Sequence, residues 1–168
     1  MAEYRETPDF LGAGVLFLNP FVRKALAGFH PKLGLWSGFG GKRQGNETIA
    51  QTAFREVVEE VFGIEIQKKE IAEIVAAVKA RFPVPARGYY IYCLPVSSIF
   101  MIVSVLERNR YSSPYYENLP HSMSELLECR SPPPNAEITK IQVFDLDRLD
   151  YIKYYVTSEF YKDLLRCS

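Results

Sequence analysis

The feature of this sequence that most constrains its fold is a glycine-dense stretch followed directly by a well-capped helix. Glycines concentrate between residues 34 and 45, and glycine permits backbone conformations and close approaches that other residues disfavour. Thr48 and Gln51 then have the spacing of a capping box, which marks the start of a helix. Helical spacing of apolar residues continues to about Phe62, and Gly63 is a typical residue just beyond a helix end. We therefore expect a loop that leads into a helix ending near Phe62.

The rest of the chain predicts a mixture of strands and helices. Strand-like patterns cover residues 14–18, 89–94 and 138–146. Helical spacing covers residues 71–82, 99–106, 122–130 and 158–165, although residues 99–106 also fit a buried strand. Residues 111–121 are rich in tyrosine and proline and predict a loop. Because strands and helices are mixed along the chain, we expect an α/β fold.

The balance of charge limits the classes of partner. The chain has 168 residues, with 20 lysines and arginines against 20 aspartates and glutamates, so its formal net charge is zero. A chain of this length typically forms one domain, and we expect a single domain over residues 1–168. Polybasic nucleic-acid binders depend on an excess of lysine and arginine. Balanced charge argues against that class, although it leaves room for a local basic patch.

Cysteine usage and hydropathy indicate the compartment. The three cysteines, Cys93, Cys129 and Cys167, are far apart and lack Cys-x-x-Cys spacing. This disfavours a disulfide framework or a cysteine zinc site, and we expect reduced thiols. The first ten residues contain no apolar signal core, and the apolar run near residues 99–106 is far shorter than the roughly 20 residues that span a bilayer. These features favour a cytoplasmic protein with no membrane partner.

Three glutamates share one face of the predicted helix. At about 100° per residue, Glu56, Glu59 and Glu60 fall within one arc, and Arg55 can pair with Glu59 at i+4. Apolar residues gather on the opposite face: Ala50, Phe54, Val57, Val58 and Val61. Clustered like charges repel one another, and carboxylates near a helix end oppose the helix dipole. A solvated acidic face is one interpretation, and a set of oxygen ligands for Mg²⁺ or Mn²⁺ is the other.

The segment that contains these residues resembles the signature of the Nudix hydrolases. That signature is G-x5-E-x7-R-E-U-x-E-E-x-G-U, where U is a bulky aliphatic residue. The positions that match in type and spacing are Gly41, Glu47, Arg55, Glu56, Val57, Glu59 and Glu60. There is one departure, because Val61 and Phe62 both precede Gly63 where the family has a single residue. The extra residue follows the carboxylates, so we expect it to alter the helix end rather than the carboxylates themselves.

The resemblance implies a fold, a reaction and a set of roles. The fold would be an α/β/α sandwich around a mixed β-sheet. The reaction would be hydrolysis of a nucleoside diphosphate derivative, NDP-X, to NMP and P-X by water attack on phosphorus, with Mg²⁺ or Mn²⁺. The implied metal ligands are the Gly40 carbonyl and the carboxylates of Glu56, Glu59 and Glu60, with Glu47 as an outer or direct ligand. Arg55 would orient the carboxylates. Glu56 is the first candidate for the general base, and Glu137 is the second unless it is an ordinary strand-edge glutamate.

Positive and aromatic residues outside the helix are candidates for substrate binding. Lys42 and Arg43 lie beside the glycines and could contact phosphates. With Arg23, Lys24 and Lys32 they form either a basic rim or a set of scattered surface charges. Tyr116, with Tyr111 and Tyr115, belongs to the 111–121 loop, which is either a lid that stacks on a base or a packed loop.

The sequence leaves the identity of X open. Free nucleotides, nucleotide sugars, dinucleotides, NADH and the 5′ cap of messenger RNA all contain the required linkage. Capped RNA would need a basic path, for which the residues between Arg23 and Arg43 are candidates. A non-catalytic nucleotide-binding module of the same fold is a further alternative, although such proteins usually lose the glutamates that this chain keeps. A homodimer also remains open.

Overall fold

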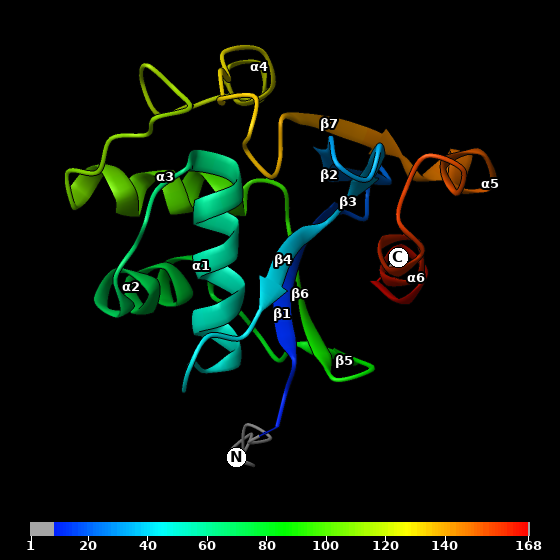
Figure 1. Cartoon of the computed structure of the whole chain (residues 1–168), viewed down its shortest axis with the longest axis horizontal. Coiled ribbons are helices and arrows are strands. Elements are labelled where there is room, and N and C mark those ends of the chain that lie inside the picture. Colours follow the sequence, from blue (N-terminus) through cyan, green and yellow to red (C-terminus); the bar gives the residue numbers. More distant parts are fainter. Residues whose placement is uncertain (1–8, 168) are drawn as a thin grey trace.

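The computed structural model describes residues 9–167 and has a mixed β-sheet with helices on both faces (Figure 1). The strands are β1 (Gly12–Asn19), β2 (Lys24–His30), β3 (Leu35–Ser37), β4 (Phe39–Lys42), β5 (Val84–Ala86), β6 (Tyr89–Leu94) and β7 (Lys140–Asp145). The helices are α1 (Ile49–Phe62), α2 (Lys68–Val78), α3 (Ser98–Arg108), α4 (Met123–Glu128), the 3-10 turn η1 (Leu146–Arg148), α5 (Leu149–Ile152) and α6 (Ser158–Cys167).

Strand β1 is the organising strand of the sheet. The strand order is β3-β2-β1-β6-β5, with β4 also paired to β1 and β7 also paired to β2. The β1–β6 pair is parallel, whereas β1 pairs with β2 and β4 in antiparallel fashion. Strands buried on both faces read as continuous apolar runs, and β1 has such a run from Ala13 to Leu18. The strand predicted over residues 14–18 is thus present, and it begins two residues earlier, at Gly12.

The two faces of the sheet carry separate hydrophobic clusters. Ala13, Val15 and Phe17 of β1 pack in a cluster with α1, α2 and α3. Leu16 and Leu18 point to the opposite face, where the cluster includes residues of α5 and α6. Figure 1 shows α1, α2 and α3 on one side of β1, β4 and β6, with α6 on the other. The predicted α/β/α sandwich around a mixed sheet is confirmed.

Strand β4 brings the glycine-dense segment against β1. Gly14 is the register partner of Gly40, and Ala13 is the partner of Gly41. A Cβ on Gly40 would lie 2.7 Å from the Cα of Gly14, so the two backbones are too close for a side chain at that point. The glycine-dense stretch between residues 34 and 45 is predicted to be a loop. The structure corrects this prediction, because β3 and β4 both lie within that stretch.

The helix predicted over residues 71–82 has different bounds in the structure. Helix α2 ends at Val78, because Lys79 adopts a left-handed conformation with φ of 50° and its amide caps the helix. Phe82, which the helical spacing included, is outside the helix and 70% exposed. Residues 99–106 do form a helix, within α3.

In the part of the chain that the structure describes, no helix has the length and apolar character needed to cross a membrane.

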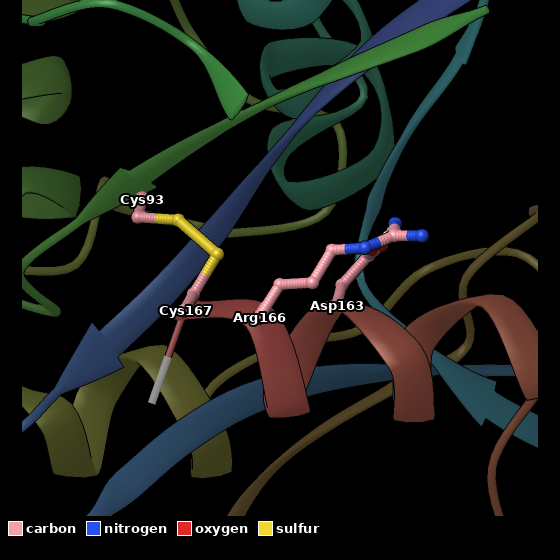
Figure 2. Close-up of a disulfide and its surroundings, with 4 residues drawn as sticks. All are labelled: Cys93, Asp163, Arg166 and Cys167. Atoms are coloured by element: carbon pink, nitrogen blue, oxygen red, sulfur yellow. Dashed lines mark hydrogen bonds and ion pairs between the residues drawn. A yellow bond between two sulfur atoms is a disulfide. The ribbon is translucent and has the colours of Figure 1, made fainter. Parts of the chain in front are cut away.

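A disulfide joins strand β6 of the sheet to helix α6. Cys93 at the end of β6 is bonded to Cys167 at the end of α6, across a sequence separation of 74 residues (Figure 2). The prediction of reduced thiols is therefore wrong for this pair, because the fold places the two cysteines together, which their spacing in the sequence does not reveal. Cys129 is a free, exposed thiol.

Candidate active site

Helix α1 is fixed at both ends by the residues that the sequence analysis identified. The Thr48 hydroxyl accepts a hydrogen bond from the Gln51 amide at 3.1 Å, and the Gln51 side chain accepts one from the Thr48 amide at 3.0 Å. Gly63 has a φ of 67° and donates its amide to the Glu59 carbonyl at 2.8 Å. The predicted apolar face is buried in the core, including Phe54, Val57, Val58 and Val61. The start, end and orientation of α1 are thus as predicted.

Arg55 links three carboxylates of the predicted site. Its Nε donates to Glu47 Oε1 at 2.6 Å, and its Nη1 donates to Glu56 Oε1 at 2.7 Å and to Glu59 Oε2 at 3.2 Å. Its Nη2 donates to the carbonyl of Lys42 at 3.0 Å. The residue is only 7% exposed, so these bonds lie in a poorly solvated environment, where they are stronger than at the surface. One guanidinium therefore fixes the positions of the carboxylates relative to the end of β4.

Glu47 is saturated by donors. Its Oε2 accepts hydrogen bonds from the Gln44 amide at 3.0 Å, the Thr52 hydroxyl at 2.9 Å and Arg55 Nη2 at 3.1 Å. Burial alone would raise the pKa of Glu47, but the hydrogen bonds from Arg55, Gln44 and Thr52 outweigh it and lower the pKa. Glu47 is therefore held ionised, with both oxygens engaged by the protein.

The other three glutamates are destabilised as anions. Burial raises the pKa of Glu56 and Glu59, and neighbouring carboxylates raise both further. Glu60 is 4% exposed, and burial together with the charge of Glu137 raises its pKa well above the usual range. Its Oε1 accepts a hydrogen bond from the Gly40 amide at 3.1 Å, while its Oε2 is buried without a partner. Arg55 offsets this effect only in part at Glu56 and Glu59, and no side-chain cation among the described residues is hydrogen-bonded to the Glu60 carboxylate.

The donor set fits a divalent cation in its chemistry. Within residues 9–167, no group of three or more histidine, cysteine, aspartate or glutamate side chains is already arranged around a metal position. The orphaned Glu60 oxygen and the repulsion among Glu56, Glu59, Glu60 and Glu137 are what a hard cation with oxygen ligands would relieve. Gly41 adds a steric constraint, since a Cβ there would lie 2.4 Å from Glu56 Cδ.

A cleft of about 750 Å³ lies next to these glutamates. It is lined on the sheet side by residues that include Gly14 and Leu16 of β1, Gly40 of β4 and Ile91 of β6. Helix α6 contributes Phe160, Lys162, Asp163 and Arg166. Glu56 and Glu137 also line the cleft, so it joins the glutamate cluster to a space large enough for a small ligand.

The charged residues of α6 were not identified from the sequence. Arg166 Nη1 lies 3.4 Å from Asp163 Oδ1, and Figure 2 shows both side chains on α6 near the disulfide. Burial raises the pKa of Asp163 to about 6, although Arg166 partly opposes this shift. In sequence, these residues read as the solvent-facing side of an amphipathic helix, and no motif distinguishes them.

The structure brings only some of the predicted substrate residues to the cleft. Lys42 lines it, but Arg43 donates its Nε to the Glu47 carbonyl at 2.9 Å and lies over the Phe10 ring at 4.6 Å. Tyr116 is 3% exposed, and its hydroxyl donates to the Leu126 carbonyl at 2.6 Å. The structure thus places Tyr116 in the core rather than in the cleft, because its ring packs against Phe62.

The predicted basic rim is not assembled as a unit. Arg23 pairs with Asp147 at 2.6 Å, and Lys24 pairs with Asp145 at 3.1 Å. Both pairs lie where β1 turns into β2 and where β7 ends, and neither basic residue lines the cleft. Among the described residues, the positive side chains in the cleft are Lys42, Arg87, Lys162 and Arg166.

Comparisons with known proteins find similarity in structure. No protein-family model and no curated protein matches this sequence significantly. A bifunctional NMN adenylyltransferase/ADP ribose pyrophosphatase from Francisella tularensis, complexed with AMP and a Mn ion, aligns at 17% identity and a TM-score of 0.49 over 96% of this chain. This chain spans 42% of that protein.

Two shorter proteins align over nearly their full lengths. The E. coli dihydroneopterin triphosphate pyrophosphohydrolase is 14% identical, with a TM-score of 0.47 over 96% of this chain and 94% of that one. A hydrolase of the NUDIX family from Clostridium perfringens is 10% identical, with a TM-score of 0.45 over 96% and 97%. Likeness at this level does not carry an activity over to this chain.

Proposed function

We propose that this protein is a divalent-metal-dependent hydrolase that cleaves the diphosphate linkage of a nucleoside diphosphate derivative, NDP-X, into NMP and P-X. The observation that carries the proposal is the buried Arg55, which ties Glu47, Glu56 and Glu59 together beside the cleft. A buried arginine with three carboxylate partners differs from the solvated acidic face that was the alternative. It supports a site in which the carboxylates are held ready for a cation.

The residues divide into those that would hold the cation and those that would position them. Glu56, Glu59, Glu60 and the Gly40 carbonyl would be the ligands. Glu47 is already saturated by Arg55, Gln44 and Thr52, which supports a positioning role for it. When bound, such a cation neutralises the charge of a diphosphate and lowers the pKa of a coordinated water.

The protein's own side chains would accept the proton and bind the substrate. Water attack on phosphorus releases a proton, and a carboxylate that lines the cleft must accept it. Glu56 is our first candidate and Glu137 our second, since both line the cleft and Glu137 interacts electrostatically with Glu56. The Lys42 ammonium, at the end of β4, would bind the phosphate oxygens.

The dimensions of the cleft favour a small substrate. Its volume of about 750 Å³ lies in the range of small-molecule sites, roughly 300–1,000 Å³. Ile91 offers an apolar surface to a base, and charged side chains of α6 also line the cleft. We therefore propose a nucleotide or small nucleotide conjugate as the substrate, rather than capped RNA.

Replacement of Glu59 and Glu60 by glutamine tests this function. The double variant keeps the size of both side chains but removes two anionic ligands, so Mg²⁺- or Mn²⁺-dependent turnover should fall by at least a hundredfold. The wild type and the variant would be assayed against NTPs, ADP-ribose, NADH, dinucleoside polyphosphates and capped RNA. Glu117→Gln, on an exposed loop position, is the matched control and should keep full activity.

Circular dichroism and thermal unfolding would show that the double variant is folded. Retained turnover in the folded double variant would refute the assignment of these glutamates. Wild-type protein that binds nucleotide and metal but hydrolyses none of the substrates would instead identify a binding module.

A further inference from the structure

The carbonyls at the end of α1 are all satisfied, and two of them depend on one distant side chain. The final carbonyls of a helix have no partner within the helix. Here the Gly63 amide donates a hydrogen bond to the Glu59 carbonyl. Arg130 then donates its Nη2 to the Glu60 carbonyl at 2.7 Å and its Nε to the Val61 carbonyl at 3.2 Å. Ser113 Oγ donates to the carbonyl of Phe62.

Arg130 is held in place from several sides. It follows α4, and its guanidinium lies over the Tyr115 ring at 5.1 Å from the centroid. The amide of Ser131, the next residue, donates to the Tyr115 carbonyl at 2.7 Å. The Tyr115 amide in turn donates to Ser113 Oγ at 3.0 Å. The loop that contains Tyr115 is thus packed against the end of α1.

The positive charge of Arg130 stabilises the negative C-terminal end of α1. The C-terminus of a helix carries about half a negative charge, which prefers nearby cations. The last turn of α1 contains no basic residue of its own, and Glu59 and Glu60 add two carboxylates there. Arg130 supplies the missing cation from 70 residues away in sequence.

We propose that Arg130 is a positioning residue of the candidate active site. By binding the carbonyls of Glu60 and Val61, it holds the last turn of α1, and with it the Glu59 and Glu60 carboxylates, in the arrangement that binds a divalent cation. The proposal rests on the proposed function in one respect, namely that these carboxylates bind such a cation.

The test compares Arg130→Met and Arg130→Lys with Arg108→Met, which removes an exposed arginine paired with Glu73 at 3.3 Å. Mn²⁺ affinity would be measured by electron paramagnetic resonance, and hydrogen exchange would be followed at the Gly63 and Ile64 amides. Residues that orient metal ligands typically contribute 10–100-fold to metal affinity. Arg130→Met should therefore weaken Mn²⁺ binding at least tenfold and speed exchange at both amides.

Arg130→Lys should recover part of the affinity, because an ammonium keeps the charge but cannot span both carbonyls as a guanidinium does. Arg108→Met should match the wild type in both measurements. Exchange rates would be corrected for global stability, obtained from urea unfolding of each variant.

Unchanged Mn²⁺ affinity in folded Arg130→Met would overturn the proposal, and so would exchange that rises equally throughout the chain. If Arg130→Met does not fold, wild-type affinity in Arg130→Lys overturns it instead. A wild type that binds Mn²⁺ but hydrolyses no NDP-X refutes the proposed function alone, and the affinity comparison still decides the role of Arg130. A wild type that binds no Mn²⁺ refutes both.

Discussion

Gly41 shows how a single residue constrains the geometry of the candidate site. A Cβ at this position would lie 2.4 Å from Glu56 Cδ and within 2.6 Å of both carboxylate oxygens. No side chain fits there unless the Glu56 carboxyl moves. Glycine is thus required at position 41 by the space that the Glu56 side chain occupies. Unusual backbone angles are not the reason, since the φ of Gly41 is not positive.

Gly41→Ala should lower metal-dependent kcat/KM by about a hundredfold, because a displacement of about 1 Å in a catalytic arrangement can have an effect of that size. Steady-state kinetics would measure the loss. Gly34→Ala is the control, since Gly34 has a φ of 65° but no atom within 4 Å of the added Cβ. It should cost about 1 kcal/mol of stability and leave kcat/KM unchanged. Wild-type kinetics in Gly41→Ala would mean that turnover does not require Glu56 where the structure places it.

Asp163 should make stability depend on pH in the acidic range. Its folded pKa is raised from 3.8 to about 6 by burial. Between these two values the unfolded chain is ionised at this residue while the folded chain still holds the proton. The protonated Asp163 carboxyl therefore makes its full contribution to stability below pH 4, and this contribution is lost as the pH rises through about 6.

Asp163→Asn replaces the titratable carboxyl with a neutral amide. The variant should therefore gain stability relative to the wild type as the pH rises from 4 to 7. Urea unfolding of the metal-free proteins at several pH values would show the gain. The stability of Asp150→Asn, at an exposed position of α5, should change with pH in the same way as that of the wild type. A constant difference between Asp163→Asn and the wild type at every pH would contradict the assignment.

Most of the candidate site residues predicted from the sequence lie near one another in the chain, and Glu137 is the distant exception among those that line the cleft. The spacing from Gly41 to Glu60 predicts the glutamates and Arg55 as site residues. Arg130, in the segment after α4, and Asp163, in α6, follow much later in the chain. Their meeting with α1 and the cleft depends on packing, which a single sequence does not encode as a local pattern.

At the scale of elements, α1 depends on its capping box. Thr48→Ala should destabilise the protein by about 1 kcal/mol, because the hydroxyl that serves the Gln51 amide is lost. Urea unfolding would report the change, and Thr48→Ser, which keeps the hydroxyl, should retain most of the stability. Equal midpoints for Thr48→Ala and the wild type would show that the cap contributes little to this fold.

The elements that could be predicted are those with strong local signals. Helix α1 has a capping box and a C-terminal glycine, and β6 is rich in aromatic and β-branched residues. Strand β2, with the sequence KALAGFH, and the glycine-rich β4 each contain only one residue of high strand propensity, Phe29 and Phe39. They are strands because β1 and β7 supply their backbone partners, and those tertiary contacts outweigh propensity.

At the scale of the whole molecule, the Cys93–Cys167 disulfide should contribute substantially to stability. Closing a loop with a sequence separation of 74 residues corresponds to about 4 kcal/mol in the chain-entropy model. Cys93→Ser should therefore lower the urea midpoint markedly under oxidising conditions. Cys129→Ser, which removes the free exposed thiol, should not. Equal midpoints for the two variants, or three titratable thiols in the unreduced, denatured protein, would contradict the pairing.

The same bond divides the candidate site between two parts of the chain. Residues 93–167 form a closed covalent ring, and this ring contains Arg130, Glu137 and the whole of α6. The glutamates of α1 and Arg55 precede it. A protease that cuts once in the exposed parts of the 111–121 loop would therefore open the ring without releasing α6. The helix that borders the cleft would stay tethered to β6 until the disulfide itself is reduced.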